Sequence, residues 1–246
     1  MTRLTGTAPH LSTDPTGSSW QPVQDLLWIS DATPRQGWWR ALRAQHARTG
    51  LWPLLLGSLS DSDPGRPWSE DGDLDPCLIR TGPGDHDPGA VLAAWWKGVE
   101  QEEWPGLAPG GEPATDPDAD ADETADMILD LGVLTLPRLG LVPAARGADA
   151  LAAAGWTGPM NHENDTAKIS CVLRSWEERF GARVVAVGFD TLYVSVAAPP
   201  TGEEHARAVA AEHLAFCPDN IWQGAGSMDA YVEQILGAPG WTFWWD

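Results

Sequence analysis

The chain has 246 residues, 43% of them hydrophobic, and carries 35 Asp and Glu against 15 Lys and Arg, for a formal net charge of −20. This length and composition support one large domain or two small ones. A negative field repels nucleic-acid phosphates and anionic membranes, so neither is an expected partner. The start of the chain lacks the pattern of a secretion signal, and no stretch reaches the ~18 apolar residues of a membrane span. We therefore expect a cytoplasmic protein.

The N-terminal half begins with a flexible arm over residues 1–20, where Thr, Ser and Pro show no periodicity. Residues 21–106 follow as an α/β portion. A strand is expected at 26–30, a helix over 34–49 capped by Thr33, and a buried strand over 51–58. A second helix, 88–104, is expected to begin after Asp87. This order predicts a strand–helix–strand arrangement.

Residues 107–122, "LAPGGEPATDPDADAD", contain acid, Pro and Gly and almost no apolar side chain. Such a composition buries too little apolar surface to offset the entropy of its ordering. We interpret the segment as an acidic linker or insertion that divides the chain.

Residues 123–246 are predicted to form a C-terminal α+β domain. Its most regular element is a helix over 166–180, with Asp165 as N-cap and Gly181 as stop. A hairpin over 182–197 follows, and a Thr201–Glu204 capping box precedes the next helix. The remaining elements are short helices at 124–132, 147–156 and 228–236, the last capped by Ser227, and strands at 139–144 and 240–246. Overall, the pattern predicts an α+β fold with helices packed on a small, mainly antiparallel sheet.

His213 and Cys217 lie four residues apart on one face of the predicted helix before Pro218. A zinc site needs three or four ligands, and this face supplies only these two. The negative end of a helix dipole also disfavours a reactive thiolate at Cys217. We therefore expect a buried, structural pair, with a metal site as the weaker alternative. The three cysteines are far apart in sequence, which favours free thiols.

A second cluster, "GPMNHENDT" at 158–166, gathers an amide, a base and an acid in Asn161, His162 and Asp165. These groups could bind a ligand or transfer protons, but Asp165 is also a typical helix N-cap and its neighbours a solvated turn. The simpler interpretation is preferred.

Basic residues are concentrated in the first predicted helix, which carries Arg35, Arg40, Arg43 and Arg48. Such arginines could face an acidic partner, or they could pair with the chain's own carboxylates. Pairing is the preferred interpretation, and partner binding stays open. The 15 tryptophans are likewise expected to fill the core for the most part, because large rings are usually buried.

Three short sequence motifs occur in a specific order: "WTGP" from Trp156, "LRSWE" from Leu173 and "AFCP" from Ala215. In these motifs the chain resembles a bacterial family known as domain of unknown function 4253, over about residues 139–246. The resemblance implies a domain boundary and a bacterial origin. It implies no activity.

The chain contains no GxGxxG, GxxxxGK[ST], GxSxG or HExxH motif. The leading hypothesis is therefore a non-catalytic binding or regulatory protein, such as an immunity-like accessory protein, with another protein as partner and no cofactor. The alternative is an enzyme, hydrolase-like or metal-dependent, that uses His162, Asp165 and also His213.

Overall fold

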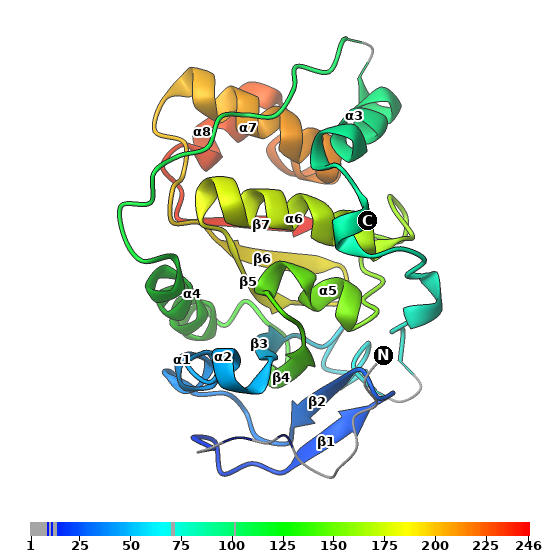
Figure 1. Cartoon of the computed structure of the whole chain (residues 1–246), viewed down its shortest axis with the longest axis vertical. Coiled ribbons are helices and arrows are strands. Elements are labelled where there is room, and N and C mark those ends of the chain that lie inside the picture. The colour runs from blue at the N-terminus through cyan, green and yellow to red at the C-terminus, as the bar shows by residue number, and fades with distance from the viewer. Residues whose placement is uncertain (1–8, 10, 12–13, 70–71, 101) are drawn as a thin grey trace.

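A seven-stranded sheet runs along the long axis of the molecule (Figure 1). The computed structural model describes residues 9, 11, 14–69, 72–100 and 102–246. The strands are β1 (Trp20–Val23), β2 (Leu27–Ser30), β3 (Leu51–Leu56), β4 (Arg138–Pro143), β5 (Arg183–Val187), β6 (Thr191–Ser195) and β7 (Gly240–Trp244). The helices are α1 (Trp38–Arg43), α2 (His46–Thr49), α3 (Pro88–Val99), α4 (Pro117–Leu131), α5 (Ala150–Ala153), α6 (Thr166–Phe180), α7 (Glu203–Phe216) and α8 (Met228–Ile235).

The strand order is β1-β2-β4-β3-β5-β6-β7, and the pairing is antiparallel except between β3 and β5. The α+β class with a mainly antiparallel sheet is thereby confirmed, as is the strand–helix–strand arrangement of the N-terminal part. Strand β3, from the N-terminal half, lies between β4 and β5, which both come after residue 137. The two halves of the chain therefore share one sheet. No helix within the described ranges is long and apolar enough to cross a bilayer.

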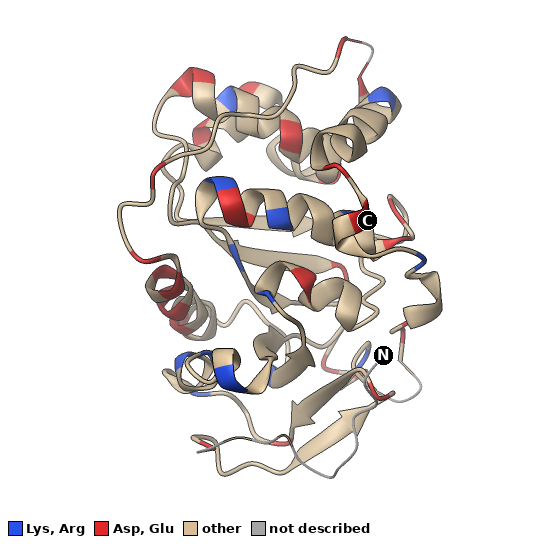
Figure 2. Cartoon of the chain, in the orientation of Figure 1, with Lys and Arg blue, Asp and Glu red and all other residues tan. Residues whose placement is uncertain are grey.

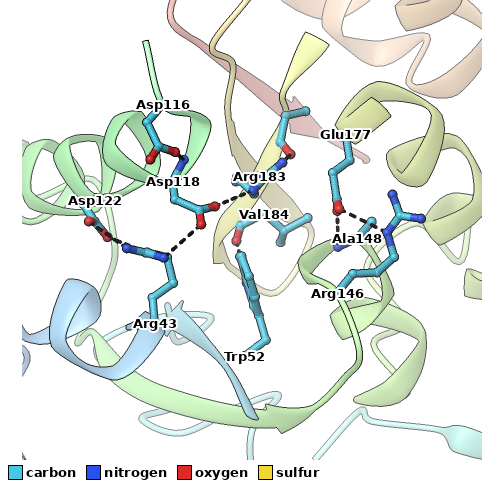
Figure 3. Close-up of polar contacts among 11 residues, drawn as sticks. Arg43, Trp52, Asp116, Asp118, Asp122, Arg146, Ala148, Glu177, Arg183 and Val184 are labelled. Atoms are coloured by element: carbon cyan, nitrogen blue, oxygen red, sulfur yellow. Dashed lines mark hydrogen bonds and ion pairs between the residues drawn. The ribbon is translucent and has the colours of Figure 1, made fainter. Parts of the chain in front are cut away.

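Strand β3 is the buried centre of this sheet, and all six of its residues are buried. A strand covered on both faces is expected to be continuously apolar, as "LWPLLL" is. Pro53 has no N–H to donate, but pairing with β5 begins only at Leu55, so the sheet loses no hydrogen bond to β5 at Pro53. The indole of Trp52 instead donates to the carbonyl oxygen of Val184 in β5, over 2.9 Å (Figure 3).

The predicted helix over 34–49 is wrong in its start and its continuity. Helix α1 begins at Trp38, after Gly37 in the left-handed conformation (φ 76°), and Thr33 does not cap it. The N–H of Gly37 donates to the carboxylate of Asp126 in α4, which fixes the turn before the helix. Residues 44–45 then separate α1 from α2.

The linker prediction for residues 107–122 is also wrong, because its second half forms the beginning of α4. Asp116 is the N-cap, and its side chain accepts the N–H of Asp118. Asp118 bridges Arg43 of α1 and Arg183 of β5, at 3.0 and 2.8 Å (Figure 3). Acidic side chains in the first turn of a helix are stabilised by the positive end of the helix dipole. Arg43 and Arg183 in addition pair with Asp118, and a solvated linker would have no such partners.

The first half of that segment is an extended strap that runs from α3 past α7 to α4 (Figure 1). We use the word strap for residues 102–115. Ala108 is buried in the strap, and the N–H of Gly111 donates to the carbonyl oxygen of Arg179 in α6. Pro109 accepts a hydrogen bond from His205 of α7, over 2.8 Å.

Most other elements match their local sequence signals. Asp87, Asp165 and Ser227 cap α3, α6 and α8 through their side chains, and Gly181 ends α6 at φ 62°. Strands β5 and β6 form the expected hairpin. The predicted Thr201–Glu204 capping box is wrong, because α7 begins after Gly202, without a side-chain cap.

We expect the fragment 138–246 to be unfolded or aggregated when produced alone. Without β3, strands β4 and β5 lose the strand that lies between them, and their exposed edges become sites of association. Circular dichroism and the dispersion of an amide NMR spectrum measure this directly, with the full chain as control. A monomeric fragment with a well-dispersed spectrum would contradict the shared-sheet interpretation.

Candidate functional site

His213 is enclosed by aromatic rings in the interior. Its side chain is 0% exposed, and the ring centroids of Trp176, Trp241 and Phe243 lie 5.0, 4.4 and 4.9 Å from its own. Burial, and secondarily the charge of Arg179, lowers the pKa of this imidazole to about 3. His213 is therefore neutral at physiological pH.

A hydrogen-bond network fixes His213 and Cys217 in structural roles. The Asn220 amide donates to the Tyr231 hydroxyl (3.2 Å) and to the carbonyl oxygen of Thr242 (2.6 Å). Because the hydroxyl accepts that bond, its proton is available for Nδ1 of His213, 3.0 Å away, so Nε2 carries the imidazole proton.

The thiol of Cys217 is part of the same network. Its sulfur donates to the carbonyl oxygen of Trp244, at 2.9 Å, and burial raises its pKa to about 12. The thiol is therefore held in its protonated form, and it joins the end of α7 to β7. Within the described ranges, no group of three His, Cys, Asp or Glu side chains lies close enough to hold a metal ion.

The polar side chains of the turn before α6 contact different partners. Asp165 caps the helix and also accepts a hydrogen bond from the Thr81 hydroxyl, at 3.0 Å. His162 packs against the ring of Trp95, and burial lowers its pKa. Asn161 donates to the main-chain oxygen of Asp246. In the described part of the chain, no contact connects His162 or Asp165 with His213.

The arginines of the first helical region bind the chain's own groups. Arg43 pairs with Asp118 and Asp122, and Arg40 pairs with Asp122 at 3.3 Å. Arg35 lies over the ring of Trp38, 5.5 Å from its centroid. Arg40 and Arg43 therefore connect α1 to α4.

A different part of the surface holds a hollow of about 500 Å³, which we call the main hollow. It lies between the β1–β2 turn, the segment 76–83, the end of β4 and α5. Its walls are mostly small or rigid apolar side chains, and Asp25 and Asp149 are the only charged groups among the described lining residues. The rest of the lining consists of Leu26, Pro76, Ile79, Pro83, Pro143, Ala144, Ala145, Ala152 and Ala153.

The two carboxylates of the main hollow differ in their partners. Asp149 is held by Arg174 through two hydrogen bonds, of 2.5 and 2.7 Å. Asp25 is exposed and makes no hydrogen bond or ion pair with any described residue. This leaves one free carboxylate at the hollow.

The free carboxylate belongs to a strained turn. Gln24 and Asp25 have φ values of 48° and 57°, and the N–H of Leu26 donates to the carbonyl oxygen of Val23. Tight hairpin turns with two positive φ angles strongly favour Asn-Gly, so Gln-Asp is a costly choice here. That mismatch is the sequence signal that could have pointed to this site.

Apart from the carboxylates of Asp25 and Asp149, the described lining of the main hollow contains no side chain that could act as nucleophile or general base. Apolar walls beside a carboxylate suit a ligand that has an apolar body and a cationic group. None of the residues singled out from the sequence lines this hollow.

Comparison with known proteins supports the resemblance noted in the sequence. Residues 138–246 match the family model described as Domain of unknown function (DUF4253). Searches of the curated proteins and of the solved structures found no match. The family match begins at the first residue of β4, so the main hollow combines residues from inside the matching region with residues that precede it.

The pH dependence of stability should report the buried state of His213. Its pKa is about 6.5 in an unfolded chain and about 3 in the folded protein, so between these values only the unfolded chain binds the proton. The stabilisation from neutral His213 is complete above about pH 6.5 and is lost as the pH falls toward about 3. Between about pH 7 and pH 5, the wild type should lose roughly 2 kcal/mol more free energy of unfolding than His213→Phe. Urea titrations measure the difference, and parallel pH profiles would contradict it.

Thiol labelling should separate the three cysteines. Cys77 is exposed, whereas Cys171 and Cys217 are buried, with pKa values raised by burial to about 11 and about 12. We expect an aromatic disulfide reagent at neutral pH to modify one thiol rapidly and the other two only on unfolding. Cys77→Ser is the matched control, because it should remove the fast phase. Fast labelling of Cys217 in that variant would overturn its structural role.

Proposed function

We propose that this protein is a non-catalytic binding protein whose main hollow receives a basic, apolar segment of a partner protein. The observation that carries the proposal is the free carboxylate of Asp25 beside a hollow of about 500 Å³ with apolar walls. This volume lies within the range of about 300–1,000 Å³ that is typical of ligand sites in proteins.

The walls favour a preformed site. Proline rings and alanine methyl groups lose almost no side-chain entropy when a ligand packs against them. Pro83 and Pro143 come from separate segments, and Ala153 comes from α5. An aliphatic or proline side chain of the partner therefore gains buried apolar area without reorganising the hollow.

The charge favours a cationic partner. Asp25 has no described partner of its own, and the net charge of −20 adds an attractive field for basic proteins. The expected recognition element is thus a Lys or Arg side chain next to aliphatic or proline residues.

The positions of the other reactive groups support a role without catalysis. Asp165 serves as a helix cap, and His213 and Cys217 are closed inside the core. Strain in the turn supports a role for Asp25 itself, because Asp occupies a left-handed position where Gly would cost less.

Binding of a short peptide tests the proposal. The probe is the capped pentapeptide acetyl-Leu-Pro-Arg-Pro-Leu-amide, and the matched peptide carries neutral citrulline in place of arginine. We expect saturable amide NMR shifts around the main hollow, and about fivefold weaker binding for the citrulline peptide or for Asp25→Asn, as for an ion pair of about 1 kcal/mol. Ala153→Trp and Ala145→Trp should abolish binding by filling the hollow.

Two controls separate binding from folding. Ala119→Trp, on the exposed side of α4, should bind the peptide like the wild type. Asp25→Gly should raise the free energy of unfolding by about 1 kcal/mol while it weakens binding, because Gly relieves the strained turn. Unchanged peptide affinity in both filled variants, or no saturable binding by the wild type, would rule out the main hollow as the site.

A further inference from the structure

Arg138, the first residue of β4, is a half-buried arginine without a carboxylate partner among the described residues. Its guanidinium donates to the main-chain oxygen of its neighbour Pro137, at 3.2 Å. Most other described arginines pair with acids: Arg40, Arg43, Arg66, Arg146, Arg174, Arg179, Arg183 and Arg207. In so acidic a chain, a guanidinium that is partly removed from water and meets no acid is available for a ligand.

Two hollows meet at this arginine. They measure about 180 and 370 Å³, and Ile29, Trp68 and Arg138 line both of them. The smaller hollow has further apolar walls from Pro64 and Leu136. The larger is more polar, and its walls include side chains of Gln21, Ser30, Asp31 and Ser69.

Leu136 marks the smaller hollow as a strained region. Its φ is 43°, a left-handed conformation that is a genuine outlier for a bulky residue, and the residue is 39% exposed. Strain of this kind persists where the surrounding structure enforces it, and it is frequent at binding sites. The side chain of Leu136 thus lies beside the smaller hollow, two residues before Arg138.

We propose that these two hollows form a second binding site, which takes a carboxylate carried on an apolar body. The carboxylate pairs with Arg138, whose planar guanidinium suits two parallel hydrogen bonds. The apolar group enters the smaller hollow, whose volume equals that of about six liquid water molecules and holds an isobutyl or phenyl group.

The charge of the site selects a carboxylate over a phosphate. Arg138 is the one cation among the described lining residues, and Asp31 lines the larger hollow. One positive charge beside an acid matches a single negative charge better than a double one. The carboxylate belongs either to a free small acid or to the C-terminus of a peptide.

This site is independent of the main hollow, because the two share no lining residue. Asp25 and Arg138 also carry opposite charges, so the two sites select opposite ligands. A variant that fills the main hollow therefore leaves this proposal testable.

The test uses the full chain and two matched probe pairs. N-acetyl-leucine is compared with N-acetyl-leucinamide, and the tetrapeptide acetyl-Gly-Ser-Gly-Leu with its C-terminal amide. We expect saturable amide NMR shifts around Arg138 with at least one acid, and at least tenfold weaker binding of its amide. Arg138→Met should weaken binding of that acid at least tenfold, and Arg138→Lys should restore part of it.

The controls define what would overturn the site. Lys97→Met, on the exposed side of α3, and Ala153→Trp should bind the acid like the wild type, whereas Ile29→Phe should block it by filling the hollows. Binding of acetyl-leucine alone identifies a free acid as the ligand, and tighter binding of the peptide identifies a C-terminus. Equal binding of acid and amide, wild-type affinity in Arg138→Met or in Ile29→Phe, or no saturable binding of either acid overturns the proposal.

Discussion

The buried carboxylate of Glu212 organises the contact between the two halves of the chain. It is 0% exposed, and a buried charge is tolerated only when it is paired and hydrogen-bonded. Arg179 binds both of its oxygens at 2.7 Å, Trp176 donates to one of them, and the N–H of Ala108 donates to the other. Since Ala108 belongs to the strap, this hydrogen bond joins the strap to α6 and α7. Removing Glu212 would leave the part-buried guanidinium of Arg179 without its carboxylate and would remove one of the hydrogen bonds that hold the strap, beside those of Gly111 and Pro109.

Arginine–carboxylate pairs also join other segments that are distant in sequence. Figure 2 shows that α4 carries many acidic residues and lies next to α1, which carries basic ones, and Figure 3 shows Asp118 between Arg43 and Arg183. In the same view, Arg146 binds Glu177 and thereby connects the end of β4 to α6. Because the chain has only 15 Lys and Arg, these internal pairs leave few cations for the surface. The field around the protein is therefore negative, and among the described arginines without an acidic partner, Arg138 is half-buried whereas Arg35, Arg48 and Arg80 are exposed.

The sequence predicts best the elements whose stability depends on residues that are close together in the chain. Helix α6 follows from its apolar period and from Asp165 and Gly181, and the β5–β6 hairpin follows from two β-rich runs around a turn. The second half of α4 is expected from sequence, but its acidic beginning could not be predicted from composition, because it is stabilised by arginines that lie 65 or more residues away in sequence. The position of β3 between β4 and β5 is likewise non-local. The main hollow could not be predicted, because proline and alanine from three separate segments carry no chemical signature until the fold brings them together.

Strand β4 connects the two proposed sites. Its first residue, Arg138, lines the hollows of the carboxylate site, and its last residue, Pro143, lines the main hollow. Its neighbour in the sheet, β2, follows the strained turn that carries Asp25 and also supplies Ile29. Each site therefore forms where the N-terminal hairpin β1–β2 meets the beginning of the family-like region, rather than inside either part alone. Of the two charged groups on which the proposed sites depend, Asp25 precedes the region matched by the family and Arg138 is its first residue.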